Sequence, residues 1–129
     1  MVSQTSKMHP NIAVMRWWKQ QDELSLMLST IVFQEARFGI EMLPAGRKRD
    51  RLEEWLEIRL RREFDGRILP VTVEIAELSG RLIAETKKAA HTAETGDALI
   101  AATARVHGLQ VATLNRDHFE KLGVELVEF

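Results

Sequence analysis

Stretches with helical periodicity alternate with short apolar runs along this whole sequence, and that alternation constrains the fold more than any other feature. In the long stretches apolar residues recur about every three to four positions, as on one face of an α-helix, whereas short apolar runs are typical of buried strands. The predicted helices are residues 12–21, 30–43, 47–64, 72–90 and 97–107, with a short turn at 118–122, and the predicted strands are residues 24–28, 68–71, 109–112 and 124–127. Such alternation predicts an α/β sandwich with a mostly parallel sheet.

The composition fits one globular domain, residues 1–129, and excludes several classes of protein. Of the 129 residues, 45% are hydrophobic and 29% charged, and the formal net charge is −1. The chain contains no cysteine, which excludes disulfide scaffolds, zinc ribbons and thiol catalysis. Its apolar runs are far shorter than the roughly 20 residues that span a bilayer. Because residues 1–7 are polar and lack the pattern of an export signal, we expect a cytoplasmic protein with no membrane contact.

Glu35 lies on an apolar face of the second predicted helix. At about 3.6 residues per turn it shares that face with Ile31, Phe38 and Met42. A carboxylate in such surroundings needs a cation, a metal or a proton, because burying an unpaired charge costs several kcal/mol. A salt bridge to Arg37 or to a more distant arginine explains the position as readily as a metal site does.

Two further polar features lie at the start of the last long helix and just beyond the strand that follows it. Asp97 shares a face with Ile100, although an aspartate at a helix start is more often an N-cap or a first-turn charge that the helix dipole favours. Residues 113–117 carry oxygen-rich side chains past the carboxyl end of a strand, where parallel sheets collect ligands, but a plain polar turn has the same composition. Together with Glu35, these positions are predicted to place oxygen ligands near one edge of the sheet. Mg²⁺ and Mn²⁺ are hard cations that prefer oxygen ligands.

The histidines, tryptophans and arginines have simpler interpretations. The four histidines lack the spacing of a zinc site, so surface or capping roles are favoured. Trp17, Trp18 and Trp55 fall on helical stripes, and the apolar surface of helices 12–21 and 47–64 predicts a homodimer. The basic residues in and after helix 47–64 are interleaved with acids, which is typical of a solvated helix face, and phosphate contact is the less favoured alternative.

Several motifs together resemble those of a known family. The string T-G-D-A-L-I-A-A-T-A at residues 95–104, with H-G-L at 107–109 and A-T-L-N at 112–115, resembles the C-terminal half of a PIN domain. More narrowly, it resembles the VapC and FitB-like toxins of bacterial toxin–antitoxin pairs. Residues 28–29, followed by E-A-R-F-G-I at 35–40, are similar to the strand and acid-bearing helix of the same family. The resemblance covers nearly the whole chain.

This resemblance implies a parallel sheet sandwiched by helices and the activity of a metal-dependent endoribonuclease. It implies that Glu35 and Asp97 are catalytic, metal-binding carboxylates. Asn115 occupies the place of a further acidic or amide ligand, and Thr113 would orient that cluster. The implied cofactor is Mg²⁺ or Mn²⁺, which activates a water for attack on a phosphodiester. The implied partners are an RNA substrate and a cognate antitoxin that neutralises the toxin.

One part of the family pattern is missing at the beginning of the chain. The family opens with a hydrophobic strand that ends in Asp-Thr-Asn, and its Asp is a principal metal ligand. Residues 2–4 match the segment that follows, so we expect the first central strand and its Asp to be absent. Either the true start lies upstream, or the chain is a truncated, catalytically inactive PIN-like protein that retains dimer or antitoxin binding. On this basis the 129-residue chain is expected to cleave RNA poorly or not at all.

Overall fold

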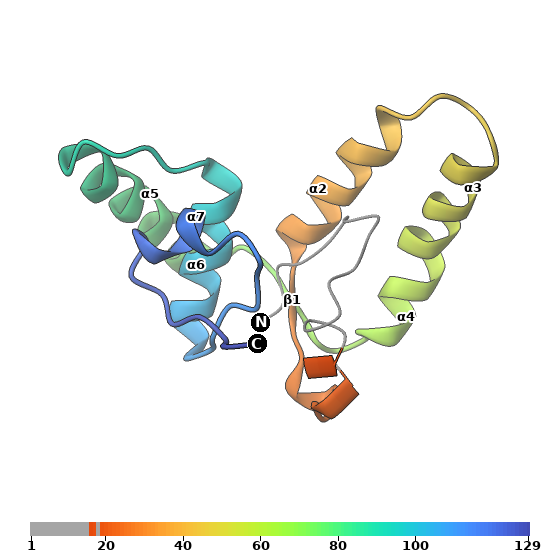
Figure 1. Ribbon diagram of the computed structural model, residues 1–129, viewed down its shortest axis with the longest axis horizontal. Coiled ribbons are helices and arrows are strands. Elements are labelled where there is room, and N and C mark those ends of the chain that lie inside the picture. The colour runs from red at the N-terminus through yellow and green to blue at the C-terminus, as the bar shows by residue number, and fades with distance from the viewer. Residues whose placement is uncertain (1–15, 18) are drawn as a thin grey trace.

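Helices on two sides of a small parallel sheet make up the computed structural model, which describes residues 16, 17 and 19–129 (Figure 1). In chain order the elements are η1 (Glu23–Ser25), β1 (Leu28–Ser29), α2 (Thr30–Glu41), α3 (Arg47–Glu54), η2 (Trp55–Leu60), α4 (Arg61–Glu63), β2 (Ile68–Leu69), α5 (Val73–Lys88), α6 (Thr95–His107) and α7 (Arg116–Glu120). Strands β1 and β2 pair in parallel, and a further parallel bridge joins Val111 to Leu126. None of the described helices is long and apolar enough to cross a membrane.

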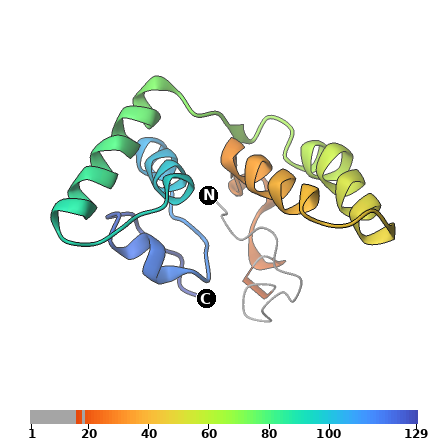
Figure 2. The same cartoon turned by 90° about the horizontal axis from the view of Figure 1, so that it is seen from above.

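The C-terminal extended segments separate two hydrophobic clusters. One cluster is built on α5 and α6 and includes Val111, and the other is built on α2 and η2 and includes Ala112 and Val127. Since successive side chains of an extended chain point to opposite faces, Val111 and Ala112 belong to different layers. Figures 1 and 2 show α5 and α6 on one side of the strands and α2 to α4 on the other. The predicted α/β sandwich is confirmed, with a smaller sheet than expected.

The ends of α2, α5 and α6 follow their sequence signals. The Ser29 hydroxyl accepts a hydrogen bond from the Ile31 amide at 3.1 Å, and the Thr72 hydroxyl accepts one from the Ile75 amide at 3.2 Å. These are N-caps, which satisfy backbone donors that have no partner within the helix. Helix α6 ends at Gly108, whose φ of 66° is a left-handed conformation that glycine adopts without strain.

The predicted helix 47–64 is observed as three joined segments, and its middle part, η2, is π-helical. Its apolar stripe, Leu52, Leu56, Leu60 and Phe64, has a strict fourfold spacing. In a regular α-helix each step of four residues rotates the side chain by about 40°, so such a stripe drifts away from the core. The wider π turn reduces this drift. Consequently, Leu56, Leu60 and Phe64 are all buried.

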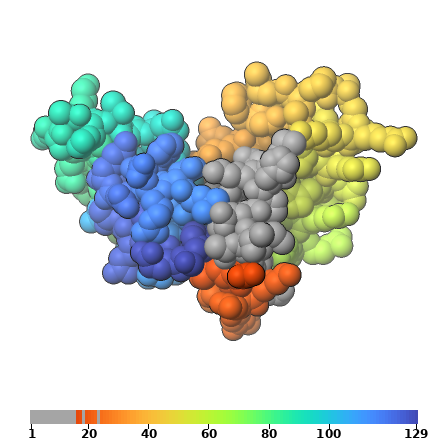
Figure 3. All heavy atoms as spheres, in the orientation of Figure 1, coloured from red at the N-terminus to blue at the C-terminus, as the bar shows by residue number. Residues whose placement is uncertain are grey.

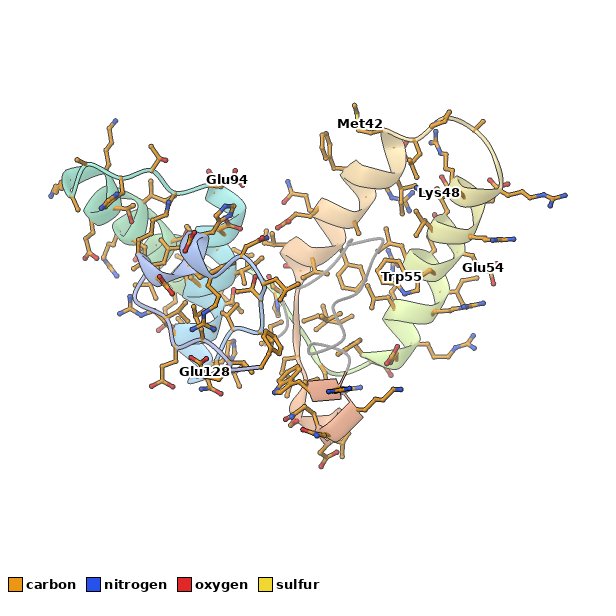
Figure 4. The ribbon with its side chains drawn as sticks, in the orientation of Figure 1. Met42, Lys48, Glu54, Trp55, Glu94 and Glu128 are labelled. Atoms are coloured by element: carbon orange, nitrogen blue, oxygen red, sulfur yellow. The ribbon has the colours of Figure 1, made fainter. Side chains whose placement is uncertain are left out.

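This packing weakens one reason for expecting a homodimer. Leu56 and Leu60 of the predicted helix 47–64 face the core, and Trp55 is half-buried against the same cluster. Figure 4 shows Trp55 on the side of η2 that faces α2. The apolar stripe of this helix is therefore covered within the chain. The other helix invoked for the dimer, residues 12–21, lies mostly outside the described residues.

The prediction of a strand at residues 24–28 is wrong in its first half. Residues Glu23–Ser25 form η1, and only Leu28, with Ser29, pairs with β2. The cause is local: a carboxylate oxygen of Asp22 accepts a hydrogen bond from the Leu24 amide at 3.1 Å, which favours a turn over extended backbone. The expected absence of the family's first strand concerns the start of the chain, which lies outside the described residues.

Candidate metal-binding site

Asp97 lies in the first turn of α6 and does not cap the helix. Helix α6 begins at Thr95, and the N-cap position is taken by Glu94, whose side chain makes no capping hydrogen bond. The Asp97 side chain is only 15% exposed, and its Oδ2 lies 3.2 Å from Nδ1 of His118 on α7. Asp97 is therefore not the N-cap, but it is an acid in the first turn, where the helix dipole favours a negative charge, and its carboxylate also contacts a second helix.

Glu35 reaches the same turn of α6 from α2. Its Oε1 atom lies 3.2 Å from the place that a Cβ atom on Gly96 would occupy, and Cγ2 of Ile31 lies 3.6 Å from that place. Glu35 follows Ile31 by one helical turn, so both side chains project from the side of α2 that meets α6. The two acids thus come from different helices and meet at the start of α6, the end marked by Glu94 in Figure 4.

The predicted position of Glu35 in the middle of a buried face is wrong. Phe38 and Met42, which share its face, are 66% and 70% exposed. The buried residues of α2 are Ile31, Val32, Ala36 and Ile40. The helix lies where two clusters meet, with Ile31 in one and Val32 in the other. Glu35 therefore stands at the border of the core, open to solvent on one side and against α6 on the other.

The salt bridge between Glu35 and Arg37 that the sequence left open is not formed. A guanidinium nitrogen of Arg37 lies 2.8 Å from Oε1 of Glu57, and Arg37 also pairs with Glu41 and Glu53. The pairs with Glu53 and Glu57 join α2 to α3 and η2, whereas the pair with Glu41 lies within α2. They support the interpretation of the charged helix as a solvated face, and they leave Glu35 to interact with α6.

The surroundings of both acids oppose their ionisation. Partial burial raises the pKa of Glu35, and the nearby charges of Asp97 and Glu94 raise it further. Burial also raises the pKa of Asp97, as does the charge of Glu94, while His118 acts in the opposite direction. A cation between these groups would remove the repulsion that holds their pKa values up. Two hard carboxylates in this state are typical of a divalent metal site.

Asn115 directly precedes α7, the helix whose His118 contacts Asp97. The buried Thr113 hydroxyl accepts a hydrogen bond from the Asn115 amide at 3.0 Å, which fixes the backbone there. The Asn115 side chain is exposed and does not cap α7. Among the described residues no hydrogen bond joins Asn115 to Glu35 or Asp97. The structure therefore brings together two of the three predicted site residues.

His118 is the site residue that the sequence analysis missed. It lies one turn after Asn115 on α7, where it contacts Asp97. The contact joins α7 to α6, so no local spacing in the sequence indicates it. The described residues contain no group of three or more His, Asp or Glu side chains placed to hold a metal ion.

The start of α6 borders a hollow of the molecular surface. Figure 3 shows a notch at the upper edge of the molecule between the lobe of α5 and α6 and the lobe of α2 and α3. Along α2, the exposed Phe38 and Met42 continue the face that carries Glu35.

Replacing Glu35 with glutamine is expected to stabilise the metal-free protein at neutral pH. The folded-state pKa of Glu35 is raised, so the free energy of unfolding falls as the pH rises from the unfolded-state pKa through the folded-state pKa. Glu35→Gln should remove this loss and gain about 0.5 kcal/mol near pH 7, a small value because solvent screens a half-exposed charge. Urea unfolding across this pH range, in chelator, measures the difference.

The matched control for this measurement is Glu54→Gln, which removes an exposed carboxylate on α3. It should give no comparable gain in stability at neutral pH, since surface substitutions usually change stability little. If Glu35→Gln instead lowered the stability at neutral pH, Glu35 would be engaged in a favourable ion pair, contrary to the geometry described above.

The chain matches the PIN domain family over residues 7–125. It is 35% identical to the plasmid stability protein StbB of Pseudomonas syringae pv. tomato over 126 residues, covering 98% of this chain and 91% of the relative. It is 33% identical to the VapC ribonuclease Y4jK of Sinorhizobium fredii over 126 residues, covering 98% and 90%. With the toxin FitB of Neisseria gonorrhoeae the identity is 32% over 118 residues, covering 92% and 85%.

Solved structures agree with these sequence relatives. The structure of FitAB bound to a DNA fragment superimposes with a TM-score of 0.86 at 28% identity, covering 98% of this chain and 94% of that chain. FitAcB from Neisseria gonorrhoeae gives a TM-score of 0.84 at 31% identity, covering 95% and 88%. The resemblance found in the sequence is thereby confirmed: the chain belongs to the PIN domain family and is a relative of the VapC and FitB toxins.

Proposed function

We propose that this protein is a ribonuclease toxin that acts in the cytoplasm and is neutralised by a cognate antitoxin. The observation that carries the proposal is the carboxylate pair of Glu35 and Asp97 at the start of α6, in a chain of the PIN domain family. Two relatives that align over most of the chain support it, since one is named a ribonuclease and the other a toxin.

The side chains at this site suit Mg²⁺ or Mn²⁺. These hard cations prefer oxygen ligands, and Mg²⁺ commonly uses one or two carboxylates together with waters and substrate phosphates. Glu35 and Asp97 offer two carboxylates whose raised pKa values reflect burial and neighbouring negative charge. When bound, the metal would supply positive charge that makes water more acidic and offsets the charge of a phosphodiester.

Each residue of the site has a separate proposed task. Glu35 and Asp97 would hold the metal from two different helices, α2 and α6. His118, at 3.2 Å from Oδ2 of Asp97, orients that carboxylate. Asn115 would add an amide oxygen next to the pair, and the hydrogen bond to Thr113 holds its backbone in place.

The proposal is tested with the native gene product, that is, the protein translated from its natural start codon. The purified protein is incubated with structured RNA in Mg²⁺ or Mn²⁺. We expect cleavage that stops on addition of a chelator and on addition of the antitoxin. A well-folded protein that binds the antitoxin but leaves RNA intact would favour the alternative, a catalytically inactive PIN-like protein. A protein that neither cleaves RNA nor binds the antitoxin would contradict both.

The homodimer remains part of the proposal. The apolar stripe of helix 47–64 is buried within the chain and does not support a dimer. The support comes instead from other apolar side chains that are exposed, including Phe38, Met42 and Val73. Sedimentation at micromolar concentration should show a dimer, and a strict monomer would remove this element of the proposal.

A further inference from the structure

Gly96, the second residue of α6, occupies a position where glycine is not required by the backbone. The residue lies inside a helix and has no positive φ, in contrast to Gly108 at the end of the same helix. Glycine in a helix is less favourable than alanine because it loses more conformational freedom on folding. Its presence one residue before Asp97 therefore calls for another explanation.

The space beside Gly96 is filled by the side chain of Glu35. A Cβ atom on Gly96 would lie 3.2 Å from Oε1 and 3.9 Å from Cδ of Glu35, and 3.6 Å from Cγ2 of Ile31. The first distance is shorter than ordinary van der Waals contact, so one side chain must yield. Ile31 is 7% exposed and packed in the core. Glu35 is the more flexible neighbour, and it would be the one displaced.

We propose that Gly96 is a positioning residue for the carboxylate pair, because its missing side chain leaves the space in which Glu35 reaches the first turn of α6 beside Asp97. The inference rests on the proposed function, since it concerns the same site. A larger residue at this position would push the Glu35 carboxylate away from Asp97. Metal binding would then weaken although both ligands are still present.

Gly80 provides a matched control within the same fold. It lies inside α5, and a Cβ atom added there would have no neighbour within 4 Å. Substitutions at Gly80 thus report the effect of a side chain on a helix alone. Substitutions at Gly96 report that effect together with the displacement of Glu35.

The first experiment measures Mn²⁺ binding by calorimetry for four proteins. These are the unsubstituted protein, Gly96→Ala, Gly96→Val and Gly80→Val. We expect Gly96→Val to weaken Mn²⁺ binding by about tenfold, the lower end of the range for residues that orient metal ligands, and Gly96→Ala to weaken it by less. Gly80→Val should bind Mn²⁺ like the unsubstituted protein. Equal affinities in all four proteins would overturn the inference.

The second experiment measures thermal unfolding in chelator and needs neither metal nor RNA. Gly80→Ala should raise Tm by about 3 °C, through helix propensity. Gly96→Ala should raise Tm by less, because its methyl group meets Glu35. In a Glu35→Ala background, Gly96→Ala should give a larger gain than it gives when Glu35 is present. Equal gains for Gly96→Ala with and without the Glu35 carboxylate would overturn the inference.

These measurements separate the inference from the proposed function. Mn²⁺ binding that depends on the size of residue 96, in a protein that does not cleave RNA, would contradict the proposed function and support the role of Gly96. If the protein cleaved RNA and Gly96→Val left its Mn²⁺ affinity unchanged, the result would support the proposed function and contradict the role of Gly96. If the unsubstituted protein did not bind Mn²⁺, the metal site and the inference would both be wrong.

Discussion

Replacing Asp97 with asparagine is expected to lower the rate of RNA cleavage by a factor of about 100 or more. A metal at a reacting phosphate contributes several kcal/mol, and each 1.4 kcal/mol or so changes a rate tenfold. Asp97 is the less exposed acid of the pair, with a side chain that is 15% exposed. Water therefore cannot easily take the place of its carboxylate at the metal. The measurement is single-turnover cleavage of one structured RNA by the native gene product and by Asp97→Asn.

The control for this prediction is Asp65→Asn, which makes the same chemical change at an exposed position after α4. It should cleave RNA at the unsubstituted rate. Circular dichroism should show that Asp97→Asn keeps its fold, because asparagine has nearly the shape of aspartate and the surroundings of Asp97 oppose its ionisation. A folded Asp97→Asn protein with nearly full cleavage would show that Asp97 is not part of the active centre.

Truncating Phe64 to alanine is expected to lower the free energy of unfolding by about 3 to 5 kcal/mol, the usual cost of a cavity left by a buried aromatic ring. Phe64 is 2% exposed at the end of the apolar stripe of η2, and the guanidinium carbon of Arg67 lies 4.7 Å from its ring centroid. Urea unfolding measures the loss.

The matched control is Phe38→Ala, which removes the same side chain from a position that is 66% exposed. It should cost less than about 0.5 kcal/mol, as surface substitutions usually do. Equal losses at the two positions would contradict the assignment of the buried side of α2, on which the position of Glu35 depends.

Local signals in the sequence were sufficient to predict most of the helices. Ser29 and Thr72 are residues typical of N-caps, and Gly108 is typical of a helix end, because such residues act through their own neighbouring backbone. The π-helical η2 was not predicted, although its fourfold stripe was visible. The stripe alone does not determine whether the backbone forms a π turn or stays α-helical with its apolar side chains drifting away from the core. The outcome depends on how Leu56 and Leu60 pack in the core.

Glu35 was predicted to be a site residue partly for a wrong reason, namely that its helix face would be buried. Periodicity correctly placed Glu35 on one face with Phe38 and Met42, but it could not show which neighbour that face meets. In the fold, Ile31 and Val32 pack into different clusters, so α2 is covered on two sides and Glu35 lies at their border. The contact between Asp97 and His118 was missed because it joins two helices.

The central claim is that Glu35 and Asp97 together hold the metal of a ribonuclease. The most direct test is the anomalous difference density of crystals of the native gene product soaked in Mn²⁺. We predict a peak at the start of α6, with one oxygen of Glu35 and one of Asp97 both at about 2.2 Å, a distance within the range for hard cations. Density that lay elsewhere, or that touched neither carboxylate in a protein whose RNA cleavage needs Mn²⁺, would contradict the claim.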